Sequence, residues 1–445
     1  MKTSGMATRL LTIIVAAILV SVPLYAFLTV WGSSLVGHYT ALRLYSEVLL
    51  IIATLLSLYL LSVHKAIRRI LFGSKLLWLI VAYVIVLIIV GVVSYSTKNV
   101  TAKALGYGLI VDTRFVVFFL VAWAAALASS FLRKHWAPIL LWPAAIVTAF
   151  GLLQAFVLPH DFLKHFGYNS STIEPTQTIN HNQKYIRIQS TLRGVNPFGA
   201  YLVLVSSLIC ALWLRLKRRW QEIILLLASL VALFYTFSRS AWIGGFVALA
   251  IIAGVWLFKT KFFSVVVAVA IAIVLIITAV VVIDHHSTRL QNIIFHTQTN
   301  SAIKTNSDQG HLSGLKAGIK DIYHQPFGGG VGTAGPASVY NPKRARIAED
   351  YYIQIGQEAG IIGLGIFLAI NISVGYRLWQ RRGDPLALGL FASFIGLIIV
   401  NLFSHAWADP TLAYLWWGLA GVAMTIKIAP KKKPSLNKKP SKAVA

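Results

Sequence analysis

A series of long apolar runs, separated by short polar turns, constrains this chain more than any other feature. A helix needs about 20 apolar residues to cross the hydrocarbon core of a membrane. Only 12% of the residues are charged, about half the share in a soluble domain. We therefore predict an all-α fold, a polytopic membrane bundle of about 12 helices. The predicted spans are 8–31, 41–63, 75–95, 113–132, 137–158, 197–215, 221–237, 240–258, 262–283, 359–376, 385–403 and 411–427.

No soluble domain and no internal repeat interrupts this pattern. We predict a single transmembrane domain over residues 1–428, which includes two long hydrophilic loops at 159–196 and 284–358. Residues 429–445 are rich in lysine and proline, and this composition predicts a disordered basic tail. The N-terminus resembles a signal peptide, but its apolar run continues to Trp31, which favours an uncleaved first helix.

The charge distribution predicts the orientation of the bundle. Basic residues cluster after the even-numbered spans and in the tail, and cytoplasmic loops carry such an excess. Both termini are therefore expected in the cytoplasm and both long loops outside the cytoplasmic membrane. The net charge of +27 is explained by these clusters, so nucleic acid is not expected as a partner. The single cysteine, Cys210, excludes an intrachain disulfide and a cysteine metal cluster.

The second long loop has internal order. Apolar residues at 312, 315, 319 and 322 follow helical spacing. Pro326 ends this helix, a glycine-rich turn follows at 327–332, and residues 347, 351 and 355 predict a second short helix. Two interpretations stay open and are compatible with each other. The first helix either lies at the membrane surface or forms a lid over a cavity.

Three arginines are placed at the outer face by this topology. Arg193 ends the first long loop, Arg239 lies in a tight turn between two spans, and Arg114 lies near the outer end of another span. A charge at membrane depth is costly and suggests a function. The arginine fork suits phosphate oxygens, which predicts a lipid-linked phosphate or diphosphate ligand. Alternatively, each arginine extends to the lipid headgroups.

Two adjacent carboxylates, Glu349 and Asp350, precede the tenth span. A carboxylate can accept the proton of an attacking hydroxyl, so both are candidate catalytic residues. Asp350 has an alternative role, because Arg346 stands four residues before it at helical spacing and can pair with it. Glu349 is therefore the preferred general base.

Three further residues are candidates for a secondary role at the site. His324 lies beside the glycine-rich turn, His405 lies in an outer turn, and Tyr352 follows the carboxylate pair. The histidines of the loops do not show the spacing of a defined metal site, so no metal is expected.

Four segments resemble, in order, motifs of the O-antigen ligase and O-antigen polymerase family of polytopic membrane glycosyltransferases. The resemblance is strongest over about 190–365. The segments are Arg193-Gly-Val-Asn-Pro-Phe-Gly-Ala-Tyr-Leu202, Phe237-Ser-Arg-Ser-Ala-Trp-Ile-Gly244, Pro326-Phe-Gly-Gly-Gly-Val-Gly332 and Glu349-Asp-Tyr-Tyr-Ile-Gln-Ile-Gly-Gln-Glu-Ala-Gly-Ile-Ile-Gly363.

The resemblance implies a GT-C-like helix bundle that transfers a glycan outside the cytoplasmic membrane. The donor would be an undecaprenyl-diphosphate-linked glycan, and the acceptor a hydroxyl of a glycan, lipid or protein. The reaction would invert the anomeric carbon and would need neither a cofactor nor an essential metal. Arg193 and Arg239 would hold the diphosphate. Ligases commonly have a histidine-asparagine pair where this chain has Glu349 and Asp350, which leaves ligase and polymerase both open.

The alternative function is a membrane transporter or flippase of a lipid-linked glycan or a small anion. Twelve helices suit that class, but transporters often consist of two similar halves with broken helices. This chain shows no half-repeat, and its hydrophilic residues gather on one face. The sequence therefore favours an enzyme of cell-surface polysaccharide biosynthesis.

Overall fold

The computed structural model describes residues 2–179, 182–215, 219–257, 307–341, 346 and 350–428. Within these residues, eight helices are long and apolar enough to cross a membrane, and two shorter apolar helices accompany them. The predicted all-α class is confirmed, and the chain is a multi-pass membrane protein. The predicted span 262–283 lies outside the described residues. Every other predicted span overlaps one or more helices, but the predicted number of 12 spans is not confirmed.

The first part of the chain forms the following helices, in order: α1 (Lys2–Ser21), η1 (Val22–Leu24), α2 (Tyr25–Val36), α3 (Tyr39–Leu42), α4 (Tyr45–Val63), α5 (Lys65–Phe72), α6 (Lys75–Ser96), α7 (Ala102–Ala128) and α8 (Phe131–Phe156). The predicted span 113–132 underestimated α7 at its N-terminal end. Charged side chains interrupt the apolar run there, but Thr101 caps the helix by accepting a hydrogen bond from the Ala104 backbone N at 3.1 Å.

The second part begins with the first long loop, which contains η2 (Phe162–Phe166) and the antiparallel strands β1 (Gln177–Ile179) and β2 (Asn182–Arg187). The remaining elements are α9 (Val195–Arg215), α10 (Trp220–Tyr235), α11 (Arg239–Leu257), α14 (Ser307–His324), η3 (Gly335–Tyr340), α15 (Tyr351–Gln380), α16 (Pro385–Asn401), η4 (Ala406–Ala408) and α17 (Pro410–Ala423).

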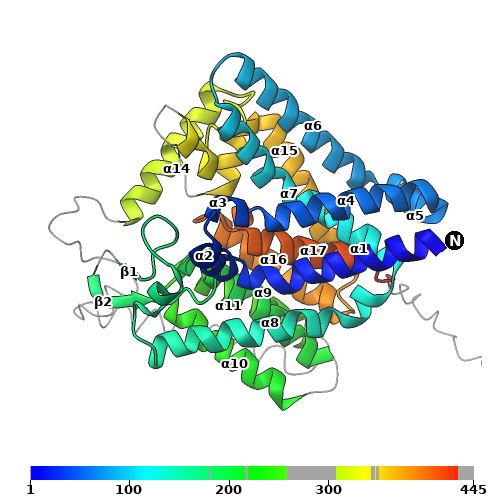
Figure 1. Ribbon diagram of the computed structural model, residues 1–445. Helices are drawn as coiled ribbons and strands as arrows, with labels where there is room; N and C mark the ends of the chain where they lie inside the picture. The colour runs from blue at the N-terminus through cyan, green and yellow to red at the C-terminus, as the bar shows by residue number, and fades with distance from the viewer. Residues whose placement is uncertain are drawn as a thin grey trace, which may run out of the picture.

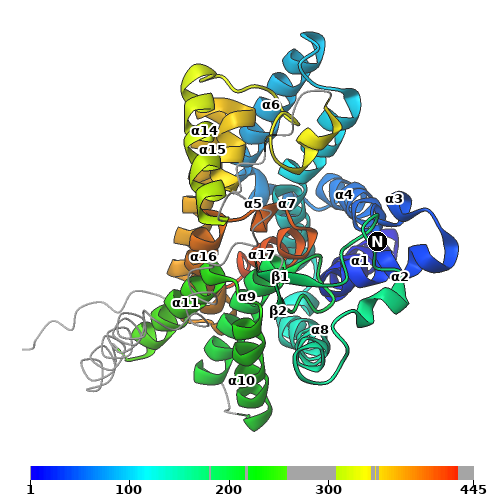
Figure 2. The ribbon, with the colours of Figure 1, turned by 90° about the vertical axis from the view of Figure 1, so that its left-hand side faces the viewer.

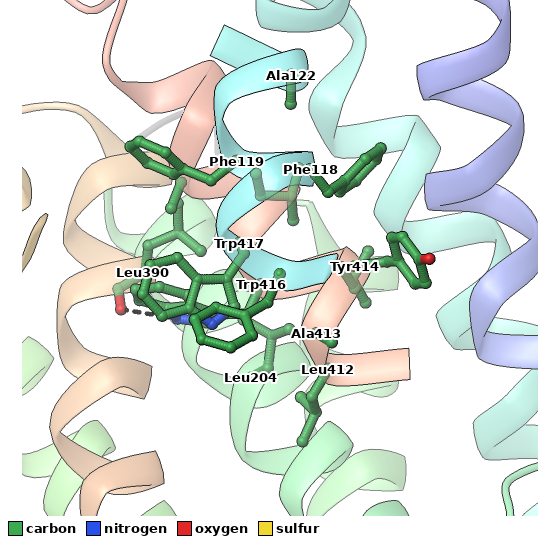
Figure 3. Close-up of a cluster of buried hydrophobic side chains, with 14 of the residues drawn as sticks. Phe118, Phe119, Ala122, Leu204, Leu390, Leu412, Ala413, Tyr414, Trp416 and Trp417 are labelled. Atoms are coloured by element: carbon green, nitrogen blue, oxygen red, sulfur yellow. Dashed lines mark hydrogen bonds between the residues drawn. The ribbon is translucent and has the colours of Figure 1, made fainter. Parts of the chain in front are cut away.

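The centre of the bundle is the packing of α17 against α7. Every residue of α17 is buried, which explains why this short helix is apolar on all sides. The rings of Trp416 and Trp417 lie 5.1 Å apart (Figure 3). The ring centroids of Phe115 and Trp417 lie 4.9 Å apart. At Gly421 a Cβ atom would lie 2.4 Å from the Phe119 backbone O. This glycine therefore permits the close approach of the two helices.

The hydrophilic elements gather at one end of the bundle, which we call the loop end. It carries β1, β2 and α14, whereas α5 and the N-terminus lie at the opposite end (Figure 1). Figure 2 looks onto the loop end and shows α14 alongside α15. The helix predicted from the spacing of residues 312–322 is confirmed as α14. It packs so closely on α15 that a Cβ atom at Gly318 would lie 2.2 Å from Ile353 Cγ2.

Candidate functional site at the loop end

Arg187, at the end of β2, is held by hydrogen bonds to the turn before α11 and to α9. Its Nε donates to the Thr236 backbone O at 2.8 Å, and its Nη2 donates to Asn196 Oδ1 at 2.9 Å and to the Phe237 backbone O at 3.3 Å. These acceptors are neutral, so none of them balances the charge of the guanidinium. Burial, followed by the nearby charge of Arg239, lowers the pKa of Arg187 to about 10.

Arg239 is the first residue of α11 and is half-buried. It follows a tight turn in which Phe237 has φ 47°, a conformation that non-glycine residues adopt at a cost. Thr236 Oγ1 stabilises this turn by accepting a hydrogen bond from the Ser238 backbone N at 3.2 Å. The turn therefore holds Arg239 beside Arg187 and presents two backbone carbonyls to Arg187. The predicted tight turn is thus observed.

Arg193 lies in the segment between β2 and α9, and its side chain is exposed. It interacts with the hydroxyl of Tyr107 on α7 and with the carboxylate of Asp409. Asp409 also caps α17 by accepting a hydrogen bond from the Thr411 backbone N at 2.9 Å. Burial raises the pKa of the Asp409 carboxyl, and the charge of Arg193 opposes this rise. Arg193 therefore joins the loop ends of α7 and α17.

The segment that carries Arg193 is held firmly by the bundle. The Ser190 backbone N donates to Gln154 Oε1 at 2.7 Å, and Ser190 Oγ donates to the Val147 backbone O at 2.6 Å. Thr191 Oγ1 donates to the Pro23 backbone O at 2.9 Å. Ser190 has φ 53°, so these bonds also maintain a costly backbone conformation. The position of Arg193 is consequently set by η1 and α8 together.

Arg114 lies deeper than the sequence suggested and is buried inside the bundle, with 5% of its side chain exposed. Its Nη1 forms an ion pair with Glu47 Oε1 of α4 at 3.1 Å. Its Nη2 donates to the Ala408 backbone O. The guanidinium fork is therefore engaged by the protein itself. The predicted role of Arg114 in diphosphate binding stays a prediction, and the geometry gives it a structural role in addition.

Asp350 directly precedes α15 and caps it. Its carboxylate accepts a hydrogen bond from the Ile353 backbone N at 2.9 Å, and burial raises the pKa of the carboxyl. The sequence offered Arg346 as its partner, but the Arg346 guanidinium lies 3.5 Å from Asp321 Oδ2 on α14. Glu349, the preferred general base, lies outside the described residues.

The secondary candidates fall at different places. Tyr352 interacts with Trp407, in the turn between α16 and α17 that also contains His405 and the Ala408 carbonyl bound by Arg114. His405 is half-buried in this turn. His324 is exposed at the end of α14, where its Nδ1 lies 2.7 Å from the Lys320 backbone O. The structure thus brings Tyr352 and His405 to the same turn, whereas His324 belongs to the surface of α14.

The glycine-rich turn at 327–332 lies directly on the first part of α15. The Gly329 backbone N donates to the Gln357 backbone O at 2.7 Å, and the Gly330 backbone N donates to the Glu358 backbone O at 3.0 Å. These bonds run beside a break in α15 at Gly360, which has φ 68°. A Cβ atom at Gly360 would lie 2.3 Å from the Pro326 backbone O, so only glycine fits.

The sequence analysis did not predict two sets of residues that lie at this site or deeper in the bundle. Arg187 lies in the first long loop, and a single arginine in a hydrophilic loop carries no signal without its neighbours. Asp112 and Glu358 are completely buried in α7 and α15. Their presence inside apolar helices is a signal that could have been used, because intramembrane carboxylates are costly.

The arrangement as a whole suits a phosphorylated ligand. Arg187, Arg193 and Arg239 come from the first long loop and α11, and backbone turns fix the segments that carry them. Donors fixed in this way can stabilise the charge that develops on a leaving phosphate. Across the described residues, no three His, Cys, Asp or Glu side chains gather closely enough to hold a metal ion.

Comparison with known proteins identifies one region of the chain. Residues 223–368 match the family model described as O-antigen ligase. No curated protein matches the chain. The matched region runs from α10 through the Arg239 turn, α14 and the glycine-rich turn to the middle of α15. The match to residues 223–368 supports placing this chain in the O-antigen ligase and polymerase family.

Proposed function

We propose that this protein transfers a glycan from an undecaprenyl-diphosphate carrier to an acceptor hydroxyl at the outer face of the cytoplasmic membrane. The O-antigen ligase domain supports a glycosyltransferase-like enzyme of polysaccharide biosynthesis. The loop end would then face outwards, and both termini would lie in the cytoplasm. The gathering of α14, β1 and β2 at the end opposite the N-terminus supports this orientation (Figure 1).

The proximity of Arg187 and Arg239 is the observation that carries the proposal. Like charges close together raise the free energy of a folded protein, and here burial adds to the cost. Among the described residues, the hydrogen-bond acceptors of Arg187 are neutral oxygens, which hold its geometry and leave its charge available. A diphosphate offers oxygens and negative charge to both guanidinium groups. Binding of the donor would therefore relieve the repulsion between them.

The reaction follows from this placement. The acceptor oxygen attacks the anomeric carbon of the first sugar, and a carbon–oxygen bond forms there with inversion. The bond between that carbon and the phosphate oxygen breaks, and the electron pair leaves with the diphosphate. Arg187, Arg193 and Arg239 stabilise the charge of the leaving group. Losing one such donor typically lowers the rate about 10²- to 10³-fold.

The hydroxyl proton would pass to a carboxylate, for which we propose Glu349. Asp350, the next residue in the sequence, is the second candidate, and its capping bond fixes it at the start of α15. Tyr352 and His405 would line the acceptor side of the site, and His324 would contact the substrate from α14. Arg114 would maintain the turn that contains Ala408 through its bond to the Ala408 carbonyl.

The proposal is tested in cells by Arg187→Ala and Arg239→Ala. Arg133→Ala is the matched control, because Arg133 is an exposed arginine at the beginning of α8. We expect the two site variants to accumulate lipid-linked glycan and to lose the polymer or conjugate, while the control resembles the wild type. Unchanged glycan products in both site variants would contradict the proposal. Loss of chain length alone would indicate a polymerase, and loss of attachment of intact chains a ligase.

A further inference from the structure

Two carboxyl groups meet in the interior of the bundle, below the site. Asp112 of α7 and Glu358 of α15 both have an exposed fraction of 0%. Both side chains belong to helices that are long and apolar enough to span a membrane. An ionised carboxylate in such a place is costly unless it is paired. Both groups therefore need hydrogen-bond donors or a neutralising proton inside the bundle.

One oxygen of each carboxyl group accepts hydrogen bonds from two donors of the protein. Glu358 Oε1 accepts hydrogen bonds from the Gly332 backbone N at 2.9 Å and the Ala334 backbone N at 3.2 Å. Asp112 Oδ1 accepts from the Tyr351 hydroxyl at 3.3 Å and from Gln354 Nε2 at 3.4 Å. These four donors come from the glycine-rich turn, the residues just after it, and the first turn of α15.

The other oxygens, Glu358 Oε2 and Asp112 Oδ2, are buried and have no separate donor among the described residues. The two carboxyl groups interact electrostatically with each other. Two ionised carboxylates are both acceptors and cannot hydrogen-bond to each other, whereas a protonated carboxyl donates through its hydroxyl. One proton placed between Oε2 and Oδ2 satisfies both oxygens and removes one negative charge.

The surrounding charges agree with a single proton. Tyr83 of α6 and Tyr351 of α15 face the pair, and Arg114 of α7 lies near Asp112. Arg114 already balances Glu47 at 3.1 Å. If both Asp112 and Glu358 were ionised, this buried region would hold three carboxylates against one guanidinium. With one proton the imbalance falls to a single negative charge, which the Tyr351 hydroxyl and Gln354 stabilise.

We propose that Asp112 and Glu358 share one proton, with Glu358 as the donor, and that this pair positions the glycine-rich turn and the start of α15. The pair connects α7 to both elements at once. Tyr351, which donates to Asp112, directly follows Asp350, the helix cap at the proposed site. The functional part of this inference rests on the proposed glycosyl transfer, whereas the shared proton does not.

Three variants of Glu358 and Asp112 test the inference. In Glu358→Gln, the amide oxygen keeps the bonds to Gly332 and Ala334, and the amide nitrogen donates to Asp112. This variant is expected to transfer glycan within a few fold of the wild type. Glu358→Ala and Asp112→Ala each leave buried partners unsatisfied. Amide hydrogen exchange of residues 328–334 should then be faster by roughly 5- to 150-fold, the factor that corresponds to losing a buried partner.

Infrared spectroscopy gives a direct readout of the proton in purified protein. The wild type should show the carbonyl band of a buried carboxylic acid, and the band should be absent in Glu358→Gln. Raising the pH should remove the proton and lower the wild-type rate, whereas the rate of Glu358→Gln should not follow this change. Hydrogen exchange and infrared spectra do not depend on glycosyl transfer, so failure of the proposed function would leave these results intact.

Several outcomes would overturn the inference. The inference is overturned if folded Glu358→Gln loses as much protection at residues 328–334 as Glu358→Ala does. The pair would then need two charges, as a bound cation would require. Absence of the carboxylic-acid band in the wild type would also overturn it. If the alanine variants do not fold, Glu358→Gln and the infrared band still decide between a shared proton and two ionised groups.

Discussion

Removing Glu47 should destabilise the bundle, because it leaves Arg114 buried without its counter-charge. The Arg114 side chain is 5% exposed, that of Glu47 is 11% exposed, and their charged atoms lie 3.1 Å apart. Breaking a buried ion pair by removing one partner costs about 3–5 kcal/mol. In the Glu47→Leu variant this corresponds to a shift of roughly a hundredfold to several thousandfold in the unfolding equilibrium.

A double variant separates the charge from the packing. In Glu47→Leu with Arg114→Met both charges are replaced by apolar side chains, a change that is often neutral or stabilising. The Ala408 carbonyl also loses the donor that Arg114 supplies, at a cost of about 1–3 kcal/mol. We therefore expect the double variant to be more stable than Glu47→Leu and less stable than the wild type.

The assay is thermal unfolding of the purified protein in lipid nanodiscs, followed by tryptophan fluorescence, together with donor binding. The ranking of the three proteins tests the account, and an unfolding temperature of Glu47→Leu equal to that of the wild type would refute it. Donor binding tests the role of Arg114. If the folded double variant binds the donor about 10²-fold more weakly, Arg114 contacts the diphosphate directly. Near-normal binding would restrict Arg114 to its structural role.

Three further predictions concern the site. Asp350→Asn should retain stability and activity because asparagine also caps helices, whereas Asp350→Ala should cost about 1 kcal/mol; a large loss of turnover in Asp350→Asn would instead make Asp350 a proton acceptor. Glu349→Gln should lower turnover by about 10²- to 10⁴-fold without weakening donor binding, and normal turnover would exclude it as the base. Gly360→Ala should displace Pro326 and abolish transfer, since φ is 68° there and the added Cβ would lie 2.3 Å from the Pro326 backbone O; wild-type turnover would show that the turn tolerates displacement.

The pH dependence of donor binding should report the charge of Arg187. Its lowered pKa of about 10 means that the guanidinium loses its proton at a lower pH than an ordinary arginine. Donor affinity should therefore stay constant from neutral pH to about pH 9 and fall as the pH passes 10. In Arg187→Gln the affinity should be low throughout and lack this transition. A wild-type affinity that is flat beyond pH 11 would contradict the assignment.

The helical fold could be predicted from the sequence, because length and hydropathy determine whether a segment spans a membrane. The boundaries of the helices were harder to predict. The apolar run that marks α7 begins after Asp112, but the helix begins at Ala102, since the bundle buries Asp112 against Glu358 and Tyr351. A carboxylate normally ends an apolar segment in sequence analysis. Tertiary partners that lie more than two hundred residues away remove that penalty.

The site could be predicted only in part from the sequence, for the same reason. Arg193 and Arg239 stand in recognisable motifs, and the structure places both at the loop end. Arg187 was missed because its significance depends on the Thr236 and Phe237 carbonyls, which a strained turn directs towards it. The depth of Arg114 followed from its pairing with Glu47 on another helix. Pairings between helices leave no pattern in a single sequence.

The central claim, that the arginines of the loop end bind a lipid-linked diphosphate donor for glycosyl transfer, is tested most directly by reconstitution. Purified protein in vesicles would receive undecaprenyl-diphosphate-linked glycan and an acceptor, and both the product and the released undecaprenyl diphosphate would be measured. We predict one undecaprenyl diphosphate for each glycan joined, with rates of Arg187→Ala and Arg239→Ala lower by about 10²- to 10³-fold and Arg133→Ala unaffected. Movement of the lipid-linked glycan across the vesicle membrane without any joined product, or full activity of both site variants, would contradict the account.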